Sequence, residues 1–198
     1  MRRMMASLMI AAVLAGCVAP GEGASDRTRV MNGALTLAAP RGFCVDPKAR
    51  REGAEGSFVL WGNCAAIAGD PEAPKPPYRA MLSATVGPAS DTPLAAAFDG
   101  FESFFRSGAG RAALARSGRA EDVQVLKVQR SGGMLLLKIA DRSAATAAPV
   151  TRSYWRAITG VKGHVTALSV LPLAGSTMRD ADQIALLQGF EAAIRAAN

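Results

Sequence analysis

An apolar stretch at the N-terminus constrains this chain most, because it decides in which compartment the remainder has to fold. Arg2 and Arg3 precede an uninterrupted run of apolar and small residues over positions 4–15. That run holds about 12 residues, whereas a membrane-spanning helix needs roughly 20. A basic start, a short apolar centre and small residues at the end are typical of an export signal. We therefore predict a cleaved signal peptide rather than a transmembrane helix.

The end of this leader carries a more specific pattern. The sequence Leu14-Ala15-Gly16-Cys17 resembles the lipobox of bacterial lipoproteins. The resemblance implies that residues 1–16 are the signal peptide, and that Cys17 becomes an N-terminus carrying acyl chains such as palmitate. Two or more such chains hold a protein stably on a membrane. The alternative is an ordinary secretory signal with a cysteine there by chance.

The resemblance to lipoproteins also implies a location, in the cell envelope and facing the periplasm. Val18 lacks the acidic character that, in enteric bacteria, resembles an inner-membrane retention signal, so we expect the outer membrane. Arg2 and Arg3 could indicate export by the twin-arginine route, but Met4 and Met5 do not continue that motif. An exported protein meets anionic lipid and glycolipid before it meets DNA, so we expect no nucleic-acid partner despite the net charge of +7.

After the leader the composition changes twice. Residues 17–33 contain Pro, Gly, Ser and charges without an apolar period, which predicts a flexible tether. From Ala34 onwards short apolar runs alternate with turn residues. The length of residues 34–198 suits one globular domain.

The cysteines predict one disulfide. The chain has three cysteines, and lipidation of Cys17 leaves Cys44 and Cys64 as the only pair. An exported compartment favours their oxidation. A reactive thiol is the alternative, but neither cysteine has a neighbouring histidine or a C-x-x-C spacing.

Apolar runs bounded by Gly, Pro and Asp predict a series of short strands and two main helices. Asp91-Thr92-Pro93 is a typical helix start, and the phenylalanines that follow at helical spacing indicate a core face rather than a ligand cavity. Glycines at 132–133 and 160–163 predict hairpin turns. The predicted strands are 34–38, 43–45, 57–67, 78–86, 122–130, 134–142, 150–158 and 164–171; the predicted helices are 91–107, a short one at 111–117, and one after Asp180.

This order of elements predicts an α+β fold, a single domain with a mainly antiparallel sheet flanked by helices. The element order over roughly residues 34–196 resembles that of Mog1/PsbP-like αβα sandwiches. That family mixes partner-binding and accessory roles, so the resemblance implies an interaction module more than an enzyme. It transfers no site residue.

Residues for catalysis and metal binding are scarce. The only histidine is His164, which follows a turn glycine at a predicted strand start, where an exposed or partly satisfied imidazole is ordinary. One histidine and two paired cysteines cannot supply a zinc site, and no nucleophile-elbow motif is found. We predict no catalytic residue, no metal and no cofactor, and an enzyme is the less favoured interpretation.

Positive charge is concentrated in residues 106–156, where ten basic side chains stand against three acidic ones. The candidates for binding an anionic surface are Arg111, Arg116, Arg152 and Arg156. Strand alternation places Arg152, Tyr154 and Arg156 on one face, which suits a sugar or phosphate contact. The alternative is that the arginines merely keep the sheet face and its edges solvated.

Three functional hypotheses result. The leading one is an exported, lipid-anchored envelope protein whose non-catalytic binding or accessory domain contacts anionic lipid, glycolipid or an envelope protein. The second is an envelope hydrolase that uses carboxylates such as Asp46, Asp99 or Asp141. The third is a carrier of a small apolar ligand, which would need an enclosed cavity of roughly 300 Å³ or more.

Overall fold

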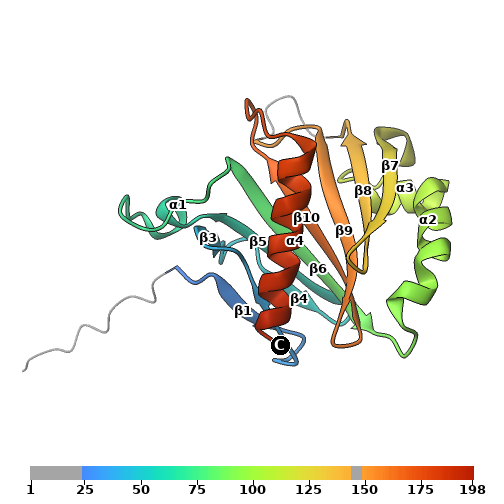
Figure 1. The fold of residues 1–198 in the computed structure, drawn as a ribbon, viewed down its shortest axis with the longest axis horizontal. Helices are drawn as coiled ribbons and strands as arrows, with labels where there is room; N and C mark the ends of the chain where they lie inside the picture. The colour runs from blue at the N-terminus through green and yellow to red at the C-terminus, as the bar shows by residue number, and fades with distance from the viewer. Residues whose placement is uncertain (1–23, 144–148) are drawn as a thin grey trace, which may run out of the picture.

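Short strands separated by tight turns make up most of the chain, with helices between and after them (Figure 1). The structure, a computed structural model, describes residues 24–143 and 149–198. In chain order the elements of this part are β1 Arg27–Val30, β2 Leu35–Ala38, β3 Phe43–Val45, β4 Arg51–Gly53, β5 Gly56–Asn63, α1 Cys64–Ala68, β6 Ala80–Ala89, the 3-10 helix η1 Leu94–Ala97, α2 Phe98–Arg106, α3 Gly108–Leu114, the 3-10 helix η2 Ala120–Asp122, β7 Val123–Ser131, β8 Met134–Asp141, β9 Ser153–Val161, β10 His164–Pro172 and α4 Asp180–Ala196.

Eight of the strands form one antiparallel sheet in the order β3-β5-β6-β10-β9-β8-β7, and β4 shares an edge of β5 with β3. The β7–β8 turn uses Gly132 and Gly133, and the β9–β10 turn uses Lys162 and Gly163. All four residues have positive φ, which matches the twist of two-residue hairpins. β1 and β2 form a separate hairpin.

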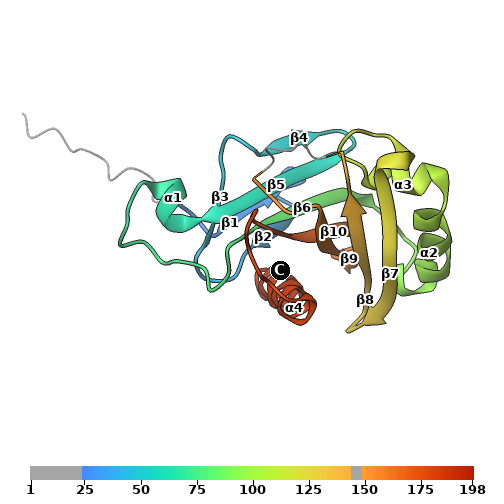
Figure 2. The same cartoon turned by 90° about the horizontal axis from the view of Figure 1, so that it is seen from above.

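One face of the sheet is covered by α4 and the β1–β2 hairpin (Figures 1 and 2). Leu187, Phe190 and Ile194 of α4 are fully buried. The Phe190 ring lies edge-on against Trp61 of β5, with ring centroids 5.2 Å apart. Burying each large apolar side chain contributes about 1.5 to 3 kcal/mol, so this contact anchors α4 to the sheet.

The opposite face is covered by η1, α2 and α3, over the half of the sheet that holds β7, β8 and β9. Figure 2 shows α2 and α3 on the far side of β7 and β8 from α4. Phe98 and Phe105 are buried against Leu135, Leu137 and Ile139 of β8. The predicted phenylalanine face is therefore core.

The fold class is as predicted: the chain forms one α+β domain with an antiparallel sheet flanked by helices. The structure also contains the Cys44–Cys64 disulfide, with Cα atoms 4.7 Å apart. The bridge joins β3 to the start of α1, directly after β5. Closing a loop of this length contributes about 3 kcal/mol in the chain-entropy model.

The domain begins earlier than predicted. Of the tether predicted over 17–33, residues 17–23 lie outside the described residues, but β1 at Arg27–Val30 pairs with β2 and Val30 is fully buried. The tether interpretation is wrong for this part, because its charged residues alternate with side chains that face the core. Trp61 Nε1 also donates a hydrogen bond to the Asp26 carbonyl at 3.0 Å.

Two more elements differ from the sequence prediction. The strand predicted over 57–67 ends at Asn63, because the Asn63 side chain accepts a hydrogen bond from the Ala65 amide at 2.9 Å and so caps α1. The helix predicted over 91–107 is divided into η1 and α2. Ser107 then caps α3 by accepting a hydrogen bond from the Gly110 amide at 3.1 Å.

Candidate functional site

The candidate site lies on the face of the sheet opposite α4, where β9 presents alternate side chains. Tyr154, Arg156 and Ile158 lie on this face, while Trp155 and Ala157 belong to the core under α4. Only Ile158 and Tyr154 are buried among the apolar residues under α2 and α3. Arg156 stands between them along β9 and is half-buried.

Two arginines contact the same tyrosine ring. The guanidinium carbon of Arg116 lies 5.7 Å from the ring centroid of Tyr154, and that of Arg156 lies at the same distance. Arg116 follows the end of α3, whereas Arg156 comes from β9. The Tyr154 side chain is almost fully buried, so its ring supports the two guanidinium groups and is not itself open to a ligand. We call Arg116, Tyr154 and Arg156 the arginine–tyrosine cluster.

The charge of one arginine in the cluster is balanced by a buried carboxylate. Asp141, at the end of β8, is fully buried and lies 3.8 Å from Arg116 Nε. Asp141 also accepts hydrogen bonds from the Arg116 amide at 3.3 Å and from the amide and hydroxyl of Ser143. This carboxylate therefore fixes the loop that carries Arg116 and offsets its charge.

Arg156 has no such partner. Its Nε donates a hydrogen bond to the buried Ser169 hydroxyl of β10 at 2.9 Å, which orients the guanidinium group. Within the described residues its terminal amino groups make no hydrogen bond or ion pair. A guanidinium group held in place with free donors is suited to phosphate or carboxylate groups.

The structure brings together only two of the four predicted arginines. Arg111 lies near β7, and its guanidinium group donates to the Arg106 carbonyl at 2.7 Å. Arg106 and Arg111 share a shallow open hollow of about 300 Å³ with the start of β7. Arg152 is exposed just before β9. Asp141 and Ser169 position the two arginines of the cluster.

The carboxylates considered for a hydrolase lie on separate elements. Asp99 is an exposed residue of α2 that pairs with Arg130, and Asp46 follows β3 at the far end of the sheet order. Asp141 pairs with Arg116 of the arginine–tyrosine cluster and accepts a hydrogen bond from the Arg116 amide. His164 Nδ1 lies 2.9 Å from the Gly87 carbonyl, as expected for a satisfied histidine. Within residues 24–143 and 149–198, no group of three His, Cys, Asp or Glu side chains is arranged to hold a metal.

The predicted lipidation site, Cys17, lies outside the described residues. Within the part that the structure describes, no helix is both long enough and apolar enough to cross a membrane. Within the part that the structure describes, Phe98 and Phe105 of α2 pack into the group of core side chains on their face of the sheet.

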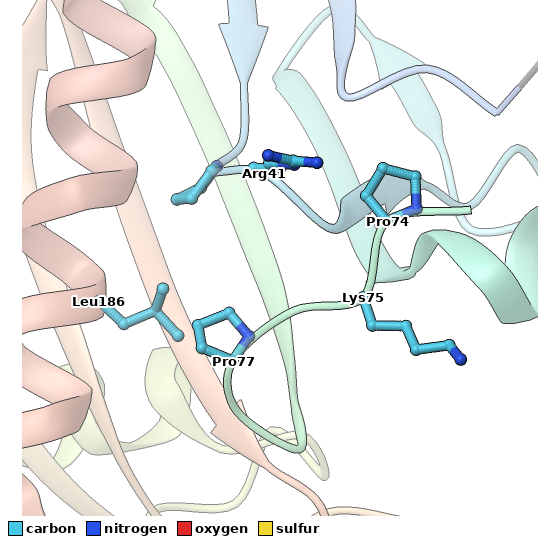
Figure 3. Close-up of a pocket in the computed structure, with 6 residues that line it drawn as sticks. Arg41, Pro74, Lys75, Pro77 and Leu186 are labelled. Atoms are coloured by element: carbon cyan, nitrogen blue, oxygen red, sulfur yellow. The ribbon is translucent and has the colours of Figure 1, made fainter. Parts of the chain in front are cut away.

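A second surface feature lies near the N-terminal edge of the domain, between the β2–β3 turn, the proline-rich loop before β6, and α4. Figure 3 shows this open hollow, of about 510 Å³. Leu186 of α4 points towards Pro77, and Arg41 and Lys75 line the same hollow. We call it the proline hollow.

Comparisons with known proteins give little beyond this geometry. No protein-family model and no curated protein matches the chain. Among solved structures, the chain is similar to the Ran-binding protein Mog1p of Saccharomyces cerevisiae, with 13% identity and a TM-score of 0.42. The similarity covers 85% of this chain and 94% of that chain. A resemblance this distant assigns neither a family nor a function.

Proposed function

We propose that this protein is an exported lipoprotein, held at the outer membrane by acyl chains on Cys17, and that its domain is a non-catalytic module that binds phosphate-bearing groups. The leader and the sequence Leu14-Ala15-Gly16-Cys17 support the anchor. The Cys44–Cys64 disulfide supports an oxidising compartment. Phosphate carried by a sugar or a lipid headgroup is the anion that such a domain meets in the envelope.

One observation carries the binding part of the proposal: Arg156 is oriented by Ser169 and Tyr154, but its charge is not paired within the described residues. Arginines that only solvate a sheet face do not need a buried serine and a buried ring to hold them. The nearby Arg116 supplies a second guanidinium group on the same ring. The two guanidinium groups bring two sets of hydrogen-bond donors to the surroundings of this ring, and such donors suit phosphate.

The test is a titration of the purified chain with glucose 6-phosphate, with glucose as the uncharged control, followed by NMR chemical shifts. We expect binding of the phosphate ester only, weakened by salt. Arg156→Gln removes a charge-assisted hydrogen bond worth about 1.5 to 3 kcal/mol, so affinity falls roughly tenfold to a hundredfold. A soluble short-chain phosphatidylglycerol in a parallel titration distinguishes a lipid headgroup from a sugar phosphate as the source.

The matched control removes two charges elsewhere. Arg106→Gln with Arg111→Gln lowers the net charge as much as Arg116→Gln with Arg156→Gln, but leaves the arginine–tyrosine cluster intact. Equal losses in the two double variants would mean that net charge attracts the anion, and would refute a built site. Unfolding curves show whether Arg116→Gln, which leaves Asp141 without its ion-pair partner, is still folded.

The anchor has its own test. Intact-mass analysis of the mature protein from its native host should give a chain that begins at Cys17 and carries acyl groups. Cys17→Ala should abolish the mass increase and release the protein from membranes. An unprocessed or unacylated chain would refute the lipoprotein assignment without affecting the binding test.

A further inference from the structure

The described chain begins at a fixed point on the domain surface. The Val45 amide donates to the Ser25 carbonyl at 2.8 Å, and the Ala39 amide donates to the Asp26 carbonyl at 2.9 Å. Ala24 and Ser25 line an open hollow that also includes Arg41 and Pro74. Arg41 and Pro74 also line the proline hollow, so the two hollows adjoin.

Chain length limits how far this point can lie from an anchor at Cys17. Ala24 is only seven positions after Cys17 in the sequence. Even fully extended, seven residues span at most about 25 Å. If Cys17 is lipidated as proposed above, the edge of the domain that carries Ala24 stays within that distance of the bilayer, so it is the edge most often presented to the membrane.

The surface of the proline hollow has the chemistry of a membrane-contacting face. Pro74 and Pro77 are exposed apolar residues that line the hollow, and Leu186 lies next to Pro77 (Figure 3). Arg41 and Lys75 line the same hollow and are exposed. Neither basic side chain forms an ion pair within the described residues. Three acidic residues, Asp26, Asp70 and Glu72, line the adjoining hollow, which shares Arg41 and Pro74 with the proline hollow. Asp182 lines a further hollow beside Pro77 and is paired with Arg179.

The loop that presents these residues is held against the domain. Gly42, with φ 93°, lies directly under it, and a Cβ at this position would come within 2.5 Å of the Lys75 carbonyl carbon and the Pro76 nitrogen. This close approach fixes the proline-rich loop on the β2–β3 turn. Exposed prolines beside Arg41 of this turn and Lys75 of the loop suit an anionic bilayer surface.

We infer that the proline hollow is the face that docks on the anchoring membrane, with Arg41 and Lys75 on anionic headgroups and the exposed prolines at the interface. The inference rests on the proposed lipid anchor. In this orientation the proline-rich loop faces the membrane. β7, which lies at the opposite end of the sheet from β3, and the neighbouring α2 are then far from the membrane.

The experiment uses the mature lipidated chain in vesicles of phosphatidylcholine and phosphatidylglycerol, with lipids brominated high in their acyl chains as quenchers. Pro77→Trp places a reporter at the proline hollow, and Phe104→Trp places one at an exposed aromatic position on α2. We expect bromine to quench the Pro77→Trp reporter and not the Phe104→Trp reporter. The unsubstituted protein gives the background from the buried Trp61 and Trp155.

A charge test is made in the Pro77→Trp chain. Arg41→Gln with Lys75→Gln should lower the ratio of docked to undocked protein roughly tenfold or more on anionic vesicles, because both charges leave the surface. Arg106→Gln with Arg111→Gln is the matched control and should leave the quenching unchanged. Loss of quenching in both double variants, or in neither, overturns the role of Arg41 and Lys75.

Flotation with the vesicles tests the anchor separately. If the protein floats and both reporters are quenched equally, or only the Phe104→Trp reporter is quenched, the inferred orientation is wrong and the anchor stands. If the protein does not float, the anchor is refuted, and the docking face with it.

Discussion

Among the described glycines, Gly110 leaves the least room for a side chain, because it packs against the end of α2. A Cβ at this position would lie 1.9 Å from the Phe104 carbonyl oxygen and 2.7 Å from the Phe105 Cα. These are backbone atoms, which cannot rotate away as a side chain can. Overpacking a well-packed contact costs about 1 to 3 kcal/mol. Gly110→Ala should therefore lower the free energy of unfolding by at least that amount, as measured by urea denaturation.

Gly108 is the matched control in the same helix, because a Cβ there would meet nothing within 4 Å. Gly108→Ala should be neutral or stabilising by up to about 1 kcal/mol, since alanine favours a helix over glycine. Similar unfolding curves for the two alanine variants would contradict the close approach of α3 to the end of α2.

The residues of the candidate site differ in how far the sequence could predict them. Strand alternation placed Tyr154 and Arg156 on one face, and charge density selected Arg116. Nothing local pairs Arg116 with Asp141, because that contact needs the loop after α3 to fold against the end of β8. Ser169 meets Arg156 only through the register of β9 with β10. Contacts between distant segments are set by the tertiary fold.

Between elements, one ion pair ties α4 to the sheet and makes this contact sensitive to acid. Lys138 Nζ of β8 donates to Asp180 Oδ2 at the start of α4 at 2.6 Å. The Lys138 ammonium group lowers the pKa of Asp180 below its ordinary value of 3.8. A carboxylate with a lowered pKa in the folded state stabilises the fold above its unfolded pKa, near 4, and loses this contribution as the pH falls through the folded value.

Lys138→Met should therefore lower the free energy of unfolding at pH 7 by up to about 1 kcal/mol, because Asp180 is roughly half exposed. At about pH 3 and below, the difference should shrink, since Asp180 is then increasingly protonated in both states. In an Asp180→Asn background the lysine substitution should have little effect at either pH. A difference that does not change with pH would show that the lysine stem stabilises by packing instead.

The strands that could not be predicted from the sequence, β1 and β4, are those without a clear apolar pattern. β1 alternates charged residues with Thr28 and Val30, and β4 is exposed along its length, so neither carries an apolar run. Both exist because a partner strand is available, β2 for the one and β5 for the other. The hairpins β7–β8 and β9–β10 were predictable because their turn glycines and apolar strands lie next to each other in the sequence.

For the molecule as a whole, the two faces of the sheet give it more than one source of stability. Core side chains lie on both faces, under α4 and under α2 and α3, and most of them come from elements other than β3 and α1, which carry the cystine. The disulfide adds to a core that already exists.

Replacing both Cys44 and Cys64 by Ala should leave the domain folded, with a free energy of unfolding about 3 kcal/mol lower, measured by urea denaturation under oxidising conditions. Cys17→Ala is the matched control, because it removes a cysteine without opening the bridge. The double variant should still bind glucose 6-phosphate if the native domain does, since the arginine–tyrosine cluster lies on β9 and the loop after α3, several strands from β3. An unfolded double variant would mean that the bridge, and not the two-sided core, holds the sheet together.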